Sequence, residues 1–345
     1  FSTNLWVADD ASSRALTGFG HTPALVWTKH RGSGSTYHTL TDSVRGGDKN
    51  LSTPVNSAES DGSHGIISSF DSDGITVIDG TNATYPRLTF NELDPFGASV
   101  GGNYVGWSWS TGTSFTNDAS STGVGTIDST GSASDTGGFS IVSYTGTGSN
   151  ATIGHGLGVA PKMIIVKNLT DARSWGVFHD SLGATQGIDL DGTGTAGSAA
   201  TYWNNTAPTN SVFSIGTANN TGAAQTYVAY CFAEKTGFSK FMGWSGNGST
   251  DGTFLYTGFK PAFFMYKVVS GTTGGWGMLD NKRDTINPVD NTLSANSNSA
   301  QADDHDVDFL SNGLKIRSAG GNINMSGATY IGMAFAKAPL VGSNN

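Results

Sequence analysis

The sequence predicts an all-β protein made of three tandem antiparallel β-sandwich-like modules with little helix. Three observations lead to this class. Glycine is abundant, with 49 of 345 residues, and only 13% of the residues are charged, about half the usual quarter. Short apolar runs alternate with turn-forming residues, and no long segment has helical periodicity. An ordered set of residues also recurs three times along the chain.

Each copy of the repeat begins with Phe-Ser, and a proline follows the phenylalanine after 22, 22 and 23 residues. A lysine follows each proline after six residues, and an aspartate follows each lysine after thirteen. An aromatic residue lies between the lysine and the aspartate, and a Tyr-led segment closes each copy. In order, these positions are Phe1, Pro23, Lys29, Tyr37, Asp42 and Tyr104; Phe139, Pro161, Lys167, Trp175, Asp180 and Tyr227; and Phe238, Pro261, Lys267, Trp276, Asp280 and Tyr330.

The repeat sets the expected module boundaries. Module one covers residues 1–112, module two 138–235 and module three 237–338, and residues 339–345 form a tail. The connector at 113–137 is rich in Ser, Thr, Gly and Asp, which fits a flexible linker or an extended strand lying on a neighbouring module. Modules two and three follow each other with almost no linker, so we expect them to pack rigidly.

The segments after the prolines predict buried strands. Residues 24–27, 163–166 and 262–266 are short unbroken apolar runs, which are typical of strands covered on both faces. The proline marks the entry to each strand, where its missing N–H does least harm.

The closing segments alternate with period two, which is the pattern of a strand. In module one, Val105, Trp107 and Trp109 share one face, and the other face carries Tyr104 followed by small residues. A small-residue face predicts that another element packs closely against it. The single cysteine, Cys231, lies on this face in module two, so we expect a small buried side chain there and no intrachain disulfide.

Two hairpin turns are predicted, at residues 72–74 and 311–313. Asp-Gly and Asn-Gly between apolar runs are typical of tight hairpins. The first also resembles half of a calcium-binding loop, but the bidentate acid that should follow is missing, so a plain turn is expected.

Longer strings carry a resemblance to a known family. They are PALVWTK, DSVRG, SFDSDG and YVGWSW in module one; GFSIVSYTGTGS, HGLGVAPKMIIVKN, WNNTAPTNSVFSIG and YVAYCFAE in module two; and GFSKFMGWSGNGSTDG, YTGFKPAFFMYK, DFLSNGLKIRS and GATYIGMAFA in module three. In this order they resemble a repeat family of tail-fibre and minor structural proteins of marine bacteriophages. The resemblance implies a location in the virion and contact with the host or with other virion proteins, and it supplies no catalytic mechanism.

The sequence lacks the residues that several classes of protein need for their function. The net charge is −9 without a basic patch, which argues against nucleic-acid binding, and no apolar stretch has the length of a membrane span. A glycosidase needs two carboxylates beside the scissile bond. The only glutamates are Glu59, Glu92 and Glu234, and most aspartates fall in turns. We therefore predict no catalytic residue, no enzymatic activity and no cofactor.

The repeated aspartates have a structural interpretation. Arg45 and Arg283 follow Asp42 and Asp280 after three residues, which predicts a local ion pair in modules one and three. Module two has Gly183 at the corresponding position.

Aromatic residues beside amides are the expected ligand-binding groups. Trp203, Asn204 and Asn205, and Trp244 with Asn247, combine a ring that stacks on a sugar with amides that bind hydroxyls. The alternative is that both tryptophans cap module cores. Asp303, Asp304, Asp306 and Asp308 are weak candidates for calcium or magnesium ligands; a solvated acidic loop is the favoured interpretation, so no bound metal is predicted.

The expected function is that of a non-enzymatic bacteriophage structural protein on the outer surface of the virion. It is expected to be a tail fibre or spike that contacts a host surface glycan or protein. One alternative is a head-decoration or other virion scaffold protein, and a second is a polysaccharide depolymerase. Low charge and uncovered sheet edges favour a homotrimer or a higher assembly with itself and other virion proteins.

Overall fold

The fold is nearly all β, as the sequence predicts. The structure is a computed structural model that describes residues 1–32, 34–97 and 101–336. Strands make up 45% of the chain and helix 4%, and all pairs between the named strands are antiparallel. The predicted tail, 339–345, lies outside the described residues.

The strands of module one form two sheets. The larger has the order β1-β9-β3-β4-β5-β6 and the smaller the order β2-β8-β7. Their bounds are β1 Ser2–Val7, β2 Ser13–Thr17, β3 Leu25–His30, β4 Thr39–Asp42, β5 Gly46–Ser52, β6 Ser60–Asp61, β7 Ile66–Asp71, β8 Gly74–Ile78 and β9 Asn103–Trp109. A short 3-10 turn, Pro95–Gly97, precedes β9.

Module two is built on an eight-stranded sheet of order β10-β11-β12-β19-β14-β15-β16-β17, with a separate pair β13-β18. The strands are β10 Thr113–Asn117, β11 Ser129–Ser134, β12 Phe139–Thr145, β13 Ala151–Gly154, β14 Met163–Asn168, β15 Gly176–His179, β16 Gln186–Asp189, β17 Gly197–Ser198, β18 Val212–Ile215 and β19 Thr226–Phe232. Two single-turn helices, α1 Ala119–Thr122 and α2 Ala200–Trp203, lie beside it.

Module three is also built on an eight-stranded sheet, of order β20-β27-β22-β23-β24-β25-β26-β21. The strands are β20 Ser239–Ser245, β21 Phe254–Tyr256, β22 Phe263–Ser270, β23 Trp276–Asp280, β24 Val289–Ser294, β25 Ala302–Leu310, β26 Gly313–Ile316 and β27 Thr329–Phe335, and α3 covers Gly321–Asn324.

The same five-strand order occurs in the three large sheets: β1-β9-β3-β4-β5, β12-β19-β14-β15-β16 and β20-β27-β22-β23-β24. The registers also agree, because Leu25 pairs with Trp109, Met163 with Phe232 and Phe263 with Phe335. The strands that follow the three prolines therefore occupy equivalent positions, as the repeat predicts.

Two details of the predicted repeat are wrong. Ser140 pairs with Cys231, and Ser2 with the equivalent Ser108, whereas Ser239 pairs with Phe335, one position further along. The Phe-Ser dipeptide of module three is thus displaced by one residue relative to the sheet. This displacement matches the one extra residue between Phe238 and Pro261.

The second wrong detail is the choice of Tyr37 as the repeated aromatic residue of module one. Trp276 pairs with Lys267, and the pairing of Thr28 with Thr39 puts His38 opposite Lys29. His38 is buried, and Tyr37 points outward with 47% of its surface exposed. Tyr37 is therefore a surface residue and has no counterpart in the other modules.

The connector belongs to a sheet and is not a flexible linker. It contains β10 and β11, and β11 pairs with β12 along its whole length. Of the two predicted arrangements, the extended strand lying on a neighbour is the one that forms, because the Ser and Thr side chains of the connector are compatible with a sheet edge.

Both predicted hairpins form. The turn after Asp71 joins β7 to β8, and the turn after Leu310 joins β25 to β26. The carboxylate of Asp73 accepts hydrogen bonds from the backbone N–H groups of Gly18 and Gly20 at 3.1 and 2.6 Å. It ties the hairpin to the rest of module one, which agrees with a plain turn.

The small-residue face of the closing strands is covered by aromatic rings. Trp6 stacks on Tyr104 with centroids 5.6 Å apart and lies directly over Gly106. Trp244 packs in the same way over Gly332. Cys231 is buried on this face in module two, as predicted.

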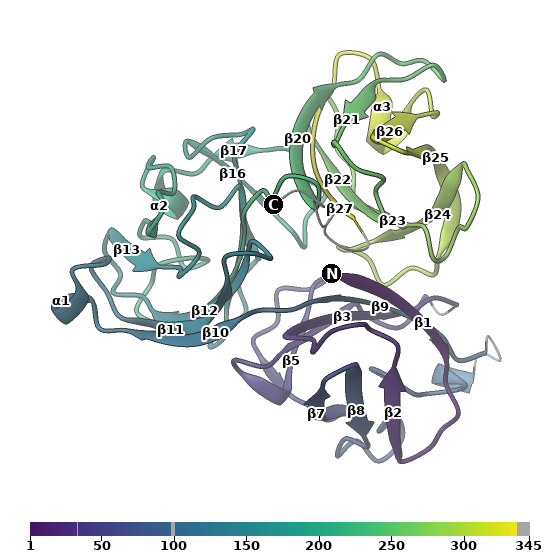
Figure 1. Cartoon of the computed structure of the whole chain (residues 1–345), viewed down its shortest axis with the longest axis horizontal. Coiled ribbons are helices and arrows are strands. Elements are labelled where there is room, and N and C mark those ends of the chain that lie inside the picture. The colour runs from purple at the N-terminus through teal and green to yellow at the C-terminus, as the bar shows by residue number, and fades with distance from the viewer. Residues whose placement is uncertain (33, 98–100, 337–345) are drawn as a thin grey trace, which may run out of the picture.

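The three modules surround a shared aromatic core. Figure 1 shows three β-rich groups around a common centre, near which the N-terminus lies. Trp109 of module one contacts Phe232 of module two and Phe335 of module three at centroid distances of 5.9 and 5.7 Å. The closing strands of all three modules thus end in one hydrophobic cluster.

Equivalent buried lysines connect the modules in a ring. Lys29 donates to the carbonyl of Asn298 in module three, Lys167 to that of Asn56 in module one, and Lys267 to that of Gly194 in module two, at 3.3, 3.3 and 2.8 Å. Burial lowers the pKa of these lysines to about 7, 8 and 8. Each lysine therefore fixes a loop of the neighbouring module, always in the same rotational sense.

The predicted Asp–Arg pairs are confirmed in modules one and three. Arg45 contacts Asp42 at 2.6 Å and Arg283 contacts Asp280 at 2.5 Å, and both pairs are buried. Asp180 of module two instead forms an exposed pair with Lys162 at 3.0 Å.

Each buried pair also receives a donor from the neighbouring module. The hydroxyl of Tyr230 donates to Asp42 at 2.8 Å, and the indole N–H of Trp107 donates to Asp280 at 3.1 Å. The equivalent strand position in module three is Met333, whose side chain has no donor. Of the three copies, two carry the arginine and two carry a donor at this position.

Candidate functional site

The tryptophans predicted to stack on sugars are core side chains. Trp203 and Trp244 are only 1% and 7% exposed. Trp244 stacks on Tyr330 at 5.3 Å, which repeats the Trp6–Tyr104 contact of module one. Neither ring presents a free face, so the interpretation that they cap the module cores describes them better.

The amides beside these rings have local roles. Asn247 donates to the carbonyl of Asp251 at 3.1 Å and accepts from the N–H of Ser249 at 3.0 Å, which closes its own loop. Asn204 and Asn205 have the left-handed backbone that ends α2, with φ of 50° and 49°. Both are exposed, and they remain candidate ligand-binding residues without the ring that the sequence placed beside them.

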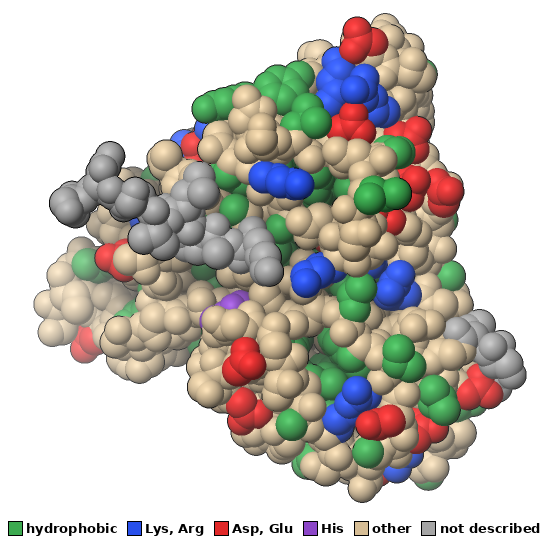
Figure 2. All heavy atoms as spheres, turned by 45° about the vertical axis from the view of Figure 1, so that its right-hand side comes forward, with side chains coloured by type: hydrophobic (Ala, Val, Ile, Leu, Met, Phe, Trp, Pro, Cys, Tyr) green, Lys and Arg blue, Asp and Glu red, His purple; other side chains and the backbone are tan. Residues whose placement is uncertain are grey.

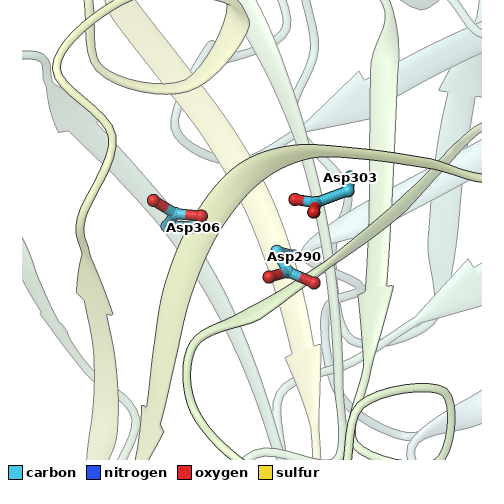
Figure 3. Close-up of side chains that lie close together, drawn as sticks. All are labelled: Asp290, Asp303 and Asp306. Carbon is cyan, nitrogen blue, oxygen red and sulfur yellow. The ribbon is translucent and has the colours of Figure 1, made fainter.

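The fold brings together two of the four aspartates that the sequence suggested as weak metal ligands. Asp303 and Asp306 meet Asp290 of β24, with carboxylate oxygens within 4.8 Å of one another (Figure 3). Asp304 instead contacts His305 at 2.5 Å, and Asp308 forms an ion pair with Arg317 at 2.6 Å. Sequence analysis missed Asp290, because only the pairing of β24 with β25 brings it to the cluster.

A pocket in module one presents exposed aromatic rings beside polar groups, and we call it the module one pocket. It has a volume of about 220 Å³. Its lining comprises Ser35, Thr36, Tyr37, Thr39, Asn50, Ser52, Ser60, Asp61, Ser63, His64, Leu88, Thr89 and Phe96. Hydroxyl, amide, carboxylate and imidazole groups therefore share a small space with two aromatic rings.

The two rings are held at the surface by the local backbone. Tyr37 and Phe96 are 47% and 44% exposed. Phe96 has φ 61° and ψ 24°, a left-handed conformation that is unfavourable for a bulky side chain and that concentrates at functional positions. Its ring leans on Tyr85 with centroids 4.7 Å apart, which fixes its orientation.

The polar groups of the module one pocket are anchored from behind. Asn50 accepts from the Thr41 hydroxyl at 2.6 Å and donates to the carbonyl of Gly65 at 3.2 Å. Asp61 forms an exposed ion pair with Lys49 at 2.6 Å. Burial lowers the pKa of His64, which favours the neutral imidazole. Its Nδ1 lies 3.0 Å from the Ser63 hydroxyl, so Nε2 is the ring nitrogen left for a ligand.

A second pocket of similar size, the module two pocket, lies between β16 and α2. Gly187, Asp189, Thr195, Ser198 and Tyr202 are among its lining residues, and its volume is about 220 Å³. A larger hollow of about 530 Å³ is lined by module one, the connector and module three, with Phe1, Phe238 and Lys282 among its residues. It adjoins the shared core.

The charged groups show no concentration of one sign on the visible face. Figure 2 shows Lys and Arg side chains mixed with Asp and Glu on a mostly neutral surface. In the described part of the chain, no helix is long and apolar enough to cross a membrane.

The chain matches one family model almost from end to end. The model describes a domain of unknown function (DUF7483), and the match covers residues 1–339. This chain belongs to that family. The match spans all three modules and the connector, so the family domain is the three-module unit and not a single repeat. No curated protein and no solved structure matches the chain.

Proposed function

We propose that this chain is a non-enzymatic structural protein on the outer surface of a bacteriophage virion, where it acts as a fibre or spike that binds a glycan of the host surface. Two observations support the proposal. The long strings of all three modules resemble tail-fibre and minor structural proteins of phages. The module one pocket offers exposed rings and polar groups together, and this observation carries the binding role.

The chemistry of the module one pocket suits a sugar. The apolar face of a pyranose stacks on an aromatic ring, and Tyr37 and Phe96 are both exposed at the pocket. Hydroxyl groups of a sugar both donate and accept, which matches the amide of Asn50, the neutral imidazole of His64 and the carboxylate of Asp61. A pocket of about 220 Å³ suits one sugar unit and leaves the rest of the polysaccharide in solvent.

The binding test uses a bacterial surface-glycan array with the purified chain. We expect Tyr37→Ala and Phe96→Ala to weaken binding about tenfold or more, because each removes a stacking face worth about 1–2 kcal/mol. Ile286→Ala is the control, since Ile286 is an exposed apolar residue of module three that lies outside the module one pocket and outside β21. Unchanged binding by both pocket variants, or an equal loss in the control, contradicts the proposal.

The absence of turnover is tested in the same preparation. The chain is incubated with a polysaccharide that it binds, and new reducing ends are followed. We expect none. Sustained release of oligosaccharide that a single Asp→Asn change abolishes would replace the adhesion proposal with a depolymerase. Labelling of purified virions with an antibody to the chain separates a fibre or spike from a head-decoration protein.

A further inference from the structure

The three copies of the repeat can be compared position by position. A side chain that differs from its two counterparts is not required by the shared fold and is a candidate for a function of its own. Ser52, Asp189 and Ser294 occupy one equivalent position, since they pair with Thr39, Gly176 and Gly277. Their backbones share a role, because Trp175 donates to the carbonyl of Ser52 and Trp276 to that of Asp189, at 3.3 and 3.0 Å. The fold therefore requires only a carbonyl here, and the carboxylate of module two has no structural counterpart.

Asp189 lines the module two pocket, which a neighbouring module keeps in shape. One wall is the glycine-rich loop at residues 192–197. The N–H of Ala196 donates to the carbonyl of Val269 at 3.0 Å, and Lys267 donates to the carbonyl of Gly194 at 2.8 Å. Both partners belong to β22 of module three. Module three thus holds this loop in place, although the loop is rich in glycine and has few side chains that could make contacts.

The carboxylate of Asp189 lacks a cation. Among the residues that the structure describes, it forms no ion pair with Lys, Arg or His. Its side chain accepts one long hydrogen bond, from the Tyr202 hydroxyl at 3.3 Å. Burial and the nearby charge of Asp191 raise the pKa of Asp189 to about 6. A half-buried anion of this kind gains from a cationic ligand.

Gly187 forms one wall of the same pocket, and the indole of Trp203 packs behind it. The indole Nε1 is buried and lies 3.1 Å from where a side-chain carbon on Gly187 would be. Trp203 is not among the residues that line the pocket, so it supports the wall and does not contact a ligand.

We propose that the module two pocket binds a sugar unit with a free amino group. The ammonium group pairs with Asp189, and an oxygen of the sugar accepts from the Tyr202 hydroxyl in place of its long bond to Asp189. The small volume, about 220 Å³, lies below the range of about 300–1,000 Å³ for drug-sized ligands and suits a monosaccharide. The site is separate from the module one pocket, so the two proposals fail independently.

The test compares three monosaccharide probes by NMR titration of the ¹⁵N-labelled full chain at pH 7.5. Glucosamine has the free amine, whereas glucose and N-acetylglucosamine lack it. We expect glucosamine to bind at least tenfold tighter than the other two, with shifts centred on residues 187–203. Equal binding of the three sugars, or no binding of glucosamine, overturns the proposal.

Acid should weaken the same interaction. Between pH 7 and 5 the amine of glucosamine is mostly protonated, while Asp189, with its pKa of about 6, loses its charge. We expect the glucosamine affinity to fall about tenfold over this range. The other titratable groups facing Asp189 are Asp191 and Tyr202, and burial raises the pKa of the Tyr202 phenol so that it stays protonated.

Two variants and one control locate the ammonium site. Asp189→Ser installs the residue that modules one and three carry at this position, so the fold should accept it, and Asp189→Asn keeps the shape. Both should reduce glucosamine binding to the level of glucose. Asp171→Asn removes the same charge outside the pocket and should leave binding unchanged. Retained preference in Asp189→Ser, or calcium binding at Asp189 without any preference for the amine, would show that the assignment is wrong.

Discussion

At the scale of single residues, repetition within the chain identifies what each side chain does. The aspartate that follows each repeated lysine after thirteen residues is buried with its arginine in modules one and three, and it accepts a donor from the next module. In module two the arginine position is Gly183, and Asp180 is exposed and pairs with Lys162. The arginine and the neighbour's donor accompany the buried aspartates because a buried carboxylate without partners is strongly unfavourable.

Tyr230→Phe tests this coupling between modules. Removal of the hydroxyl takes one hydrogen bond from the buried carboxylate of Asp42, and bonds to charged groups contribute about 1.5–3 kcal/mol. Tyr144→Phe is the matched control, because its hydroxyl donates to the neutral carbonyl of Thr221 at 2.7 Å, a bond worth about 0.5–1.5 kcal/mol. Urea unfolding should show the larger loss for Tyr230→Phe; an equal or smaller loss counts against a role for Asp42 in joining the modules.

At the scale of elements, the connector becomes part of the module two sheet. Its strand β11 lies between β10 and β12, and Gly131 makes a close approach possible. A side-chain carbon at this position would lie 2.1 Å from the carbonyl oxygen of Ile141. The strand can pair along its full length only because this residue has no side chain.

Gly131→Val should therefore detach β10 and β11 from the sheet. We expect a loss of about 1–3 kcal/mol in the free energy of unfolding, the usual cost of overpacking, and faster hydrogen exchange of the amides at 113–134. Thr130→Ala changes an exposed residue of the same strand and should alter stability by less than about 0.5 kcal/mol. Unchanged exchange in Gly131→Val would mean that the strand is not held by this contact.

At the scale of the whole molecule, three modules within one chain close around a shared core. The ring of lysine contacts joins module one to three, two to one and three to two. Several strands are terminal in their sheets, among them β10 and β21, each of which pairs with a single strand. Tyr256 and Phe254 of β21 are exposed beside that free edge, and exposed edges of this kind favour association.

Self-association is the prediction at this scale. We expect a homotrimer or a higher assembly of the chain, measured by multi-angle light scattering at micromolar concentration. Tyr256→Lys should shift the distribution toward monomer, because a charge on an edge strand disfavours pairing with another chain. A stable monomer of the unmodified chain at that concentration contradicts the prediction. Assembly would also add avidity to individually weak glycan contacts.

The all-β class, the equivalence of the strands after the three prolines, both hairpins and the two Asp–Arg pairs follow from the sequence alone. These features depend on neighbours along the chain, since period-two alternation, turn residues and an i,i+3 ion pair are local. The sequence did not locate the candidate sites. Trp203 and Trp244 stand beside amides in the sequence, as in a sugar-binding platform, but the fold buries their rings. Tyr37 is exposed because of the pairing register of its strand, and Phe96 because of its left-handed backbone.

The roles of Asp189, Asp290 and the ring of lysines depend on the tertiary structure. Each depends on contacts between residues far apart in the sequence, or on a side chain that differs from its counterparts in the other modules. A local pattern predicts which face of a strand is apolar. It does not specify which polar group that strand meets when three modules close around one core, because that meeting is fixed by the packing of the modules against one another.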